Sequence, residues 1–212
     1  MIRVLFVLCV FVVFVATTSL SQDRLVVHIT NLEDPAFVTY YLSQNRRIVG
    51  HKEISNTNRS PIIDSAARLL KIPYGSPWCL SIQYYLADLA AKELSIVNPM
   101  TPTASTYIYY NIMSKNAYKT LYLNYSMYNL KVGDQLLYRL DYTQKGHINV
   151  VDSIINRRMI VTIGGNESDR DPSSRTGGMM VKRNRIIDPV LAKKLPRLRL
   201  RGVIRFEYKS YQ

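Results

Sequence analysis

Apolar and polar residues follow two different rhythms along this chain, one in each half. In the first half, apolar residues recur every three or four positions, which is typical of amphipathic helices. Three segments have this spacing: residues 61–71, 78–94 and 103–115. Pro61 and Pro102 stand where two of them begin, and proline is favoured in the first turn of a helix. We therefore expect three helices in this region.

The second half has the two-residue alternation and the β-branched residues that favour strands. The expected strands are residues 135–140, 147–153, 158–163 and 203–208. One short strand is expected earlier, at residues 25–29, and the polar residues 43–59 are interpreted as loop. Helices followed by a run of antiparallel strands predict an α+β fold.

The first residues have the pattern of a secretory signal peptide. Arg3 is followed by thirteen apolar residues, 4–16, and then by small and polar ones. This run is shorter than the roughly 20 apolar residues that span a membrane. Ser19 and Ser21 fit a cleavage site before Gln22, so we expect a secreted or periplasmic protein with no membrane span after cleavage. A retained signal anchor is the alternative.

The chain of 212 residues has room for one main domain. With 47% hydrophobic and 20% charged residues it has enough apolar material for a core, which excludes a disordered or collagen-like protein. The predicted organisation is a signal peptide at 1–21, an N-terminal strand and polar lead-in at 22–60, and the main domain at 61–212. We expect a monomer.

Cleavage would leave a single thiol. Cys9 lies inside the apolar leader, so Cys79 would be the only cysteine of an exported chain, with no disulfide partner. Such a thiol is either buried as a small hydrophobic group or used as a nucleophile. The position of Cys79 favours a role as nucleophile, because the turn-forming residues 72–77 place it at the start of a helix. The positive end of the helix dipole favours thiolate there.

A nucleophilic thiol needs a base, and the candidates are His28, His51 and His147. His51 falls in the predicted loop and His28 in the early strand, where surface or core roles are expected. His147 follows Gly146 and begins a hydrophobic strand, which would hold its ring on a rigid element. It is the preferred base.

A third side chain should orient the imidazole, and the segment GGNES at 164–168 offers two candidates one strand further on. Asn166 is the first choice, as a neutral amide acceptor, and Glu167 is the second. The alternative is that this segment is only a glycine turn in which asparagine adopts a left-handed conformation.

Four motifs in order resemble the signatures of CHAP domains, the cysteine, histidine-dependent amidohydrolases and peptidases. They are YGSPWCLSI at 74–82, KVGDQLLY at 131–138, GHINVV at 146–151 and GGNESD at 164–169. The resemblance covers most of residues 61–205. It implies a papain-like fold in which helices carrying the nucleophile pack on an antiparallel sheet carrying the base.

The resemblance also implies a function: cleavage of peptidoglycan amide bonds, as an N-acetylmuramoyl-L-alanine amidase or a peptide endopeptidase. Cys79 matches the nucleophile, His147 the base, and Asn166 or Glu167 the orienting group. The chain departs from the usual family pattern in two places. Residues 80–83 are LSIQ where small residues and a Phe are usual, and Asn149 stands where Gly is common.

Other chemistries have little support. Three histidines and one remaining cysteine give no zinc-ligand spacing, and no glycine loop is long enough to hold phosphates. No cofactor, metal or specific nucleic-acid partner is expected. The net charge of +13 instead suggests an anionic polymer. Ten of the basic residues lie between Lys182 and Lys209, and Arg197, Arg199 and Arg201 would share one face of a strand.

The sequence thus predicts an exported cysteine hydrolase that acts on peptidoglycan. The alternative is a catalytically inactive secreted protein that binds anionic cell-surface polymers. Acyl transfer through the same thioester also remains open. The three arginines are interpreted either as a solvated edge strand or as a stripe that holds the protein on the wall.

Overall fold

The protein is described here from a computed structural model, which covers residues 24–124, 130–140, 143–156, 159–168, 178–186 and 198–208. The predicted signal peptide and Cys9 lie outside these residues. The described part has four helices: α1 (Phe37–Arg47), α2 (Pro61–Leu69), α3 (Cys79–Glu93) and α4 (Thr106–Asn116). None of the described helices is both long and apolar enough to cross a membrane.

Seven strands in the described residues form one sheet. They are β1 (Arg24–Leu32), β2 (Lys119–Asn124), β3 (Gln135–Leu140), β4 (Gly146–Asn156), β5 (Met159–Glu167), β6 (Met179–Ile186) and β7 (Leu198–Tyr208). Their order across the sheet is β2-β1-β7-β3-β4-β5-β6. The pair β1–β7 is parallel and the other pairs are antiparallel. The expected α+β class is confirmed, but the sheet is mixed and not purely antiparallel.

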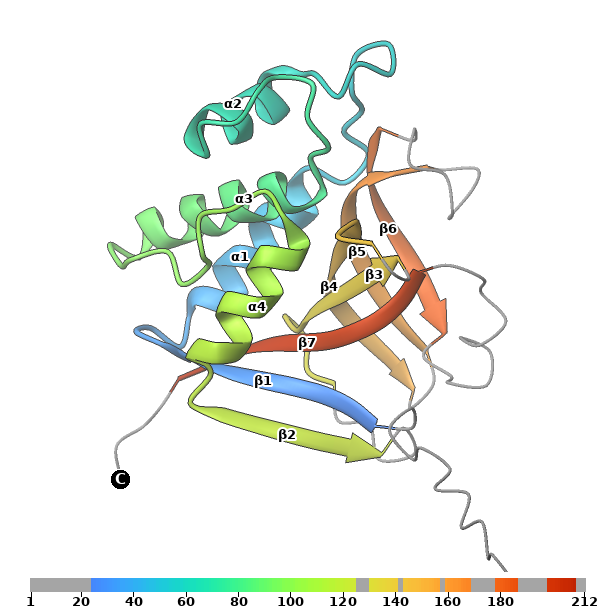
Figure 1. Ribbon diagram of the computed structural model, residues 1–212. Coiled ribbons are helices and arrows are strands. Elements are labelled where there is room, and N and C mark those ends of the chain that lie inside the picture. The colour runs from blue at the N-terminus through green and yellow to red at the C-terminus, as the bar shows by residue number, and fades with distance from the viewer. Residues whose placement is uncertain are drawn as a thin grey trace, which may run out of the picture.

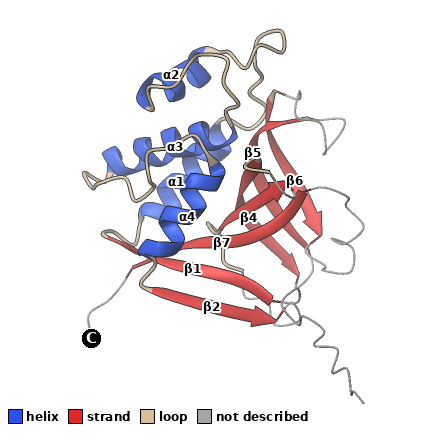
Figure 2. Ribbon diagram, in the orientation of Figure 1, coloured by secondary structure: helices blue, strands red, loops and turns tan. Residues whose placement is uncertain are grey.

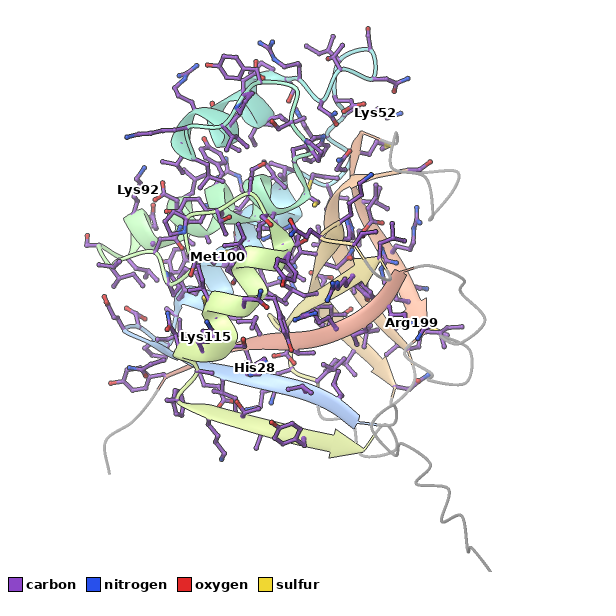
Figure 3. The ribbon with its side chains drawn as sticks, viewed as in Figure 1. His28, Lys52, Lys92, Met100, Lys115 and Arg199 are labelled. Carbon is purple, nitrogen blue, oxygen red and sulfur yellow. The ribbon has the colours of Figure 1, made fainter. Side chains whose placement is uncertain are left out.

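The helices gather on one side of the twisted sheet, and α3 runs beside α1 and α2 (Figure 1, Figure 2). The main core fills the layer between helices and sheet, where Met100 lies among the packed side chains (Figure 3). A second buried cluster joins residues of β1, such as Val27, to Val151 of β4 and Ile160 of β5. Because these strands are not neighbours in the sheet order, the sheet must curl around that cluster.

The predicted helices exist with small changes at their ends. The third begins at Thr106, not at residue 103, because the Ser105 side chain accepts a hydrogen bond from the backbone N–H of Ile108 and caps the helix there. The four strands predicted in the second half match β3, β4, β5 and β7, of which the last three are longer than expected.

Three elements were not predicted. Helix α1 occupies part of the segment interpreted as loop, and it buries Phe37, Tyr41 and Asn45 at four-residue spacing. Strands β2 and β6 form the two edges of the sheet. Edge strands with charged, partly exposed side chains give weak hydrophobic patterns.

The N-terminal strand belongs to the same sheet as the rest. Val27 of β1 pairs with Val203 of β7, and Leu25 pairs with Leu123 of β2. Strand β7 therefore lies between the first strand of the described chain and β3.

Candidate active site

Cys79 is the first residue of α3. The chain reaches it through a turn in which Gly75 has a φ of +82°, and Trp78 is the capping residue. Trp78 caps without a side-chain hydrogen bond, and the first turn carries no acidic residue. The first backbone N–H groups of a helix have no partners inside it. In α3 these N–H groups are thus able to bind negative charge beside the Cys79 sulfur.

Trp78 anchors this helix start to the sheet. Its side chain is 1% exposed, and its indole N–H donates to Glu53 Oε2 at 3.3 Å. Gly165 of β5 lies directly against it, because a Cβ at that position would come within 2.6 Å of Trp78 Cζ3. The glycine thus permits the close approach of strand and helix that sets the position of Cys79.

His147 lies near the start of β4, and its side chain is 15% exposed. Its ring bonds Glu167 and lies close enough to the Cys79 sulfur for that group to raise its pKa. Nε2 lies 3.0 Å from Glu167 Oε1. The structure therefore brings together Cys79, His147 and the second-choice orienting residue, Glu167.

Glu167 is buried, with 5% of its side chain exposed, and its Oε1 accepts several hydrogen bonds. The donors include His147, the side-chain amide of Asn149, and Arg185 Nη2 at 2.6 Å. Arg183 adds a second positive charge 4.0 Å from Oε2. The carboxylate is thus held by groups that stabilise its charged form.

Asn166, the first choice, does not contact His147 in the hydrogen bonds described. It has a φ of +59°, and its Oδ1 is buried without a hydrogen-bond partner among the described residues. The β5–β6 register shifts between Gly164 and Glu167. This β-bulge takes up one extra residue, so Glu167 occupies the register position that Asn166 would have in a regular strand. The left-handed asparagine of the alternative is present, but the segment is the end of strand β5 and not a glycine turn.

The charges of this group support one another. Burial opposes charge on His147, but the nearby Cys79 and Glu167 raise its pKa to about 9. Burial likewise opposes charge on Glu167, but the hydrogen bond from His147 and the charge of Arg185 lower its pKa to about 2. An imidazolium therefore lies between the sulfur and a carboxylate at neutral pH.

The other two histidines have separate partners. His28 bonds the Tyr110 hydroxyl at 3.0 Å and the Thr120 hydroxyl at 3.2 Å. His51 Nε2 lies 2.8 Å from the Ser60 hydroxyl. In the described residues, no three His, Cys, Asp or Glu side chains gather in an arrangement that would hold a metal ion.

Both departures from the family pattern have structural explanations. Leu80 and Ile82 are fully buried in the core, and Gln83 accepts a hydrogen bond from the Tyr41 hydroxyl at 2.5 Å. Asn149 holds the carboxylate of Glu167. Sequence analysis missed this role of Asn149, although its two-residue spacing from His147 already placed both on one face of a strand.

The arginines that were predicted to form a positive stripe, Arg197, Arg199 and Arg201, are not shown on one common face. Arg197 lies outside the described residues. Arg201 turns toward α4, with its guanidinium carbon 4.5 Å from the centre of the Tyr110 ring. Arg205 is buried in a paired contact with Asp134, at 2.7 and 2.8 Å. Several of the counted charges are therefore used inside the fold.

Comparisons of the chain with models of protein families, with curated proteins and with solved structures found no match.

Proposed function

We propose that the protein is an exported, papain-like cysteine hydrolase of the CHAP type that cleaves amide bonds of peptidoglycan. The grouping of Cys79 with His147, and the hydrogen bond from His147 to Glu167, carry this proposal. A thiol, an imidazole and an orienting carboxylate in this order are the parts of an activated sulfur nucleophile. The four motifs in sequence order support the substrate class.

In the proposed reaction, the Cys79 thiolate attacks the amide carbonyl carbon and the carbonyl oxygen becomes an oxyanion. Backbone N–H groups at the start of α3 stabilise this oxyanion. His147 gives its proton to the amine as the C–N bond breaks, which leaves a thioester on Cys79. His147 then takes a proton from water, whose oxygen attacks the thioester and releases the acid and the thiolate.

Glu167 acts on His147 and not on the substrate. It holds Nε2, which fixes the orientation of the imidazole ring, and its charge stabilises the imidazolium that forms during the reaction. The buried position of the carboxylate strengthens both effects, because water screens it poorly.

The deciding experiment is to incubate the purified protein with peptidoglycan and to identify the released fragments by mass spectrometry. The wild type should release new amine and carboxyl ends at a single type of amide bond. Cys79→Ala should lower this release by at least about a hundredfold, and so should His147→Ala. Iodoacetamide should inactivate the wild type.

Tyr74→Ala is a suitable control, because this residue is half exposed and lies in the same turn region as Cys79. It should keep the activity of the wild type within a few fold. Full cleavage by Cys79→Ala would overturn the proposal. Retention on walls without any cleavage by the wild type would favour the inactive binding protein.

A further inference from the structure

Arg185 of β6 reaches across β5 to the carboxylate that binds His147. Its Nη2 lies 2.6 Å from Glu167 Oε1, the same oxygen that His147 Nε2 meets at 3.0 Å. Its Nε donates to the Thr162 hydroxyl at 3.0 Å, and its guanidinium carbon lies 5.8 Å from the centre of the Tyr138 ring. The side chain is 20% exposed. These contacts hold the guanidinium in one place beside Glu167.

Two cations therefore share one carboxylate oxygen at neutral pH. The imidazolium of His147 and the guanidinium of Arg185 both donate to Glu167 Oε1. Each takes part of the negative charge that would otherwise stabilise the other, and the two positive groups repel each other. Because water screens these buried groups poorly, the presence of Arg185 weakens the hold of His147 on its proton.

The other charged groups near His147 have different geometry. The ionisable side chains that face its ring in the described residues come from four elements: Cys79 (α3), Tyr138 (β3), Glu167 (β5), and Arg183 and Arg185 (β6). Arg183 Nη1 lies 4.0 Å from Oε2, the other oxygen of Glu167, and its Nη2 donates to the Ser168 carbonyl. Of the two arginines, Arg185 is the one that shares Oε1 with His147.

The strength of this hold matters most in the second half of the proposed reaction. The thioester sulfur of Cys79 carries no charge, and His147 must then accept a proton from water. The water oxygen attacks the thioester carbonyl carbon, the C–S bond breaks, and the thiolate leaves. A general base works best when its pKa is near the ambient pH, and the pKa of His147 is raised to about 9. A cation that opposes this proton therefore favours the step.

We propose that Arg185 is a positioning residue that acts through Glu167 Oε1 to limit how strongly His147 holds its proton, so that His147 can serve as base in thioester hydrolysis. This inference rests on the proposed hydrolase function and deepens it, because it assigns a residue to the second half of the reaction.

The first test is a pH titration of the histidine ring carbons by NMR, in the full chain. The sequence has three histidines, and His147→Asn assigns the signal of His147. Arg185→Gln removes the positive charge and should raise the pKa of His147 by about one pH unit. Arg185→Lys keeps the charge and should restore the wild-type value. Thermal unfolding shows whether each variant is folded, and Arg185→Met gives the same information if Arg185→Gln is not.

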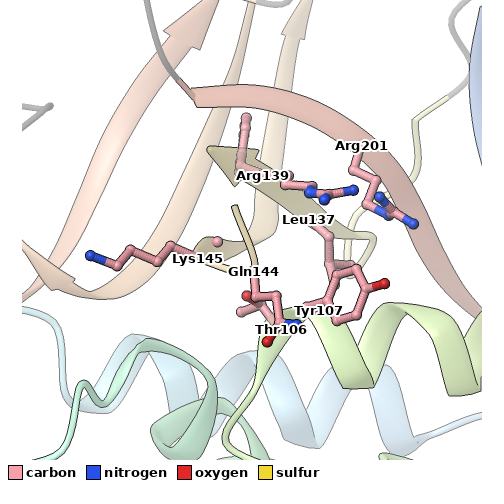
Figure 4. Close-up of a pocket in the computed structure, with 9 residues that line it drawn as sticks. Thr106, Tyr107, Leu137, Arg139, Gln144, Lys145 and Arg201 are labelled. Carbon is pink, nitrogen blue, oxygen red and sulfur yellow. The ribbon is translucent and has the colours of Figure 1, made fainter. Parts of the chain in front are cut away.

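Two other arginines supply matched controls. Arg139 follows Tyr138 on β3, so it lies on the opposite face of the strand, with its guanidinium carbon 5.2 Å from the centre of the Tyr107 ring (Figure 4). Arg139→Gln should leave the pKa of His147 unchanged. Arg183→Gln should raise it by less than half as much as Arg185→Gln does, because Arg183 faces the other oxygen. An equal rise in all three variants would overturn the inference, since positive charge anywhere in the sheet would then suffice.

The second test is kinetic. In Arg185→Gln the thioester should accumulate at pH 7, so kcat and KM should fall together by about tenfold while kcat/KM changes little. Mass spectrometry of the protein during turnover should show the added acyl group. The kcat of this variant should recover as the pH rises, because His147 then loses its proton. A loss of kcat that is the same at every pH would show a structural role and overturn the inference.

The NMR titration needs no substrate, so it separates this inference from the proposed function. If the wild type cleaves no peptidoglycan but the pKa of His147 rises in Arg185→Gln, the hydrolase proposal fails and the link from Arg185 to His147 stands. If the wild type cleaves peptidoglycan and the pKa of His147 is the same in both proteins, the role of Arg185 is overturned and the hydrolase proposal stands.

Discussion

Glu167 is the residue on which the charge state of the candidate site depends most. Its carboxylate contacts His147, Asn149 and Arg185, and its pKa is lowered to about 2. The contribution of this shift to stability is complete above pH 4.5 and is lost as the pH falls through about 2. The raised pKa of His147 acts in the opposite sense. Its contribution is complete below pH 6.5 and is lost as the pH rises through about 9.

The directions of these two pKa shifts predict the effect of Glu167→Gln. The free energy of unfolding of this variant should fall most, relative to the wild type, between pH 4.5 and 6.5, where both charges are present. The difference should shrink as the pH rises through about 9, because His147 loses its proton in the wild type. Urea unfolding of both proteins across this pH range measures the difference in their free energy of unfolding. Cleavage of wall peptides at pH 7 should also fall, by about ten- to a hundredfold, because the imidazolium loses its counter-charge.

Asn166→Gly is the control for this prediction. Asn166 has a left-handed backbone, which glycine adopts without strain, and it makes no hydrogen bond to His147 among those described. The variant should keep both the activity and the pH dependence of the wild type. A severe loss in Asn166→Gly together with an unchanged Glu167→Gln would show that the orienting role belongs to Asn166.

The sequence was sufficient to predict the residue types of the candidate site. It was less informative about which of two neighbouring residues contacts His147. Cys79 and His147 were predicted because each follows a turn and begins a regular element. The choice between Asn166 and Glu167 depends on one extra residue in a bulge, which moves the strand by one position. No local pattern reports such a shift. The roles of Arg183 and Arg185 depend on the register of β5 against β6, which pairs residues distant in the sequence.

At the scale of elements, the contact between α3 and β5 decides where the nucleophile lies. Gly165 meets both Trp78 and Ile82, since an added Cβ would lie 2.6 and 2.7 Å from atoms of these side chains. The neighbours belong to the buried core, so neither moves away easily.

Gly165→Ala should therefore destabilise the protein by about 1–3 kcal/mol. It should lower activity further than the loss of folded protein explains, because the displaced Trp78 carries Cys79 with it. Urea unfolding and kcat at saturating substrate measure the two effects. The control is Gly50→Ala, where an added Cβ meets nothing within 4 Å and only the strain of a φ of +86° remains. Equal stability and activity in both variants would show that the glycine contact does not position α3.

The elements that sequence analysis found are those whose own residues give a clear signal. Helix α2 has proline at its first position and a serine cap whose oxygen accepts from Ile63, and β3 has a run of buried apolar residues. Helix α1 was missed because its second half, SQNRR at 43–47, is polar and its buried face there is the polar Asn45. Strand β6 was missed because it contains Lys182, Arg183 and Arg185, and such charged residues are typical of an edge strand.

For the whole molecule, the central position of β7 links the ends of the described chain. Arg205 of β7 is buried and pairs with Asp134 next to β3, and Thr30 of β1 donates to the Arg205 carbonyl. Strand β1 lies on the other side of β7 and buries Leu25, Val27 and Ile29 in the second core cluster.

A fragment of residues 61–212 should consequently fail to fold alone. It would lack β1, leave one edge of β7 open and expose the second cluster. Circular dichroism and amide-proton dispersion in NMR spectra should show loss of fixed structure, whereas residues 22–212 should be folded. A stable, cooperatively unfolding fragment 61–212 would show that β1 and α1 are accessory to the domain.

The central place of β7 also affects the order in which the protein assembles. A nascent chain that ends before residue 198 has β1 with β2, and β3 with β4, β5 and β6, but no described strand that joins the two groups. The hydrogen bond from Thr30 to Arg205 spans 175 positions, and pairings between such distant residues form slowly. The sheet is thus completed only after β7 has been synthesised.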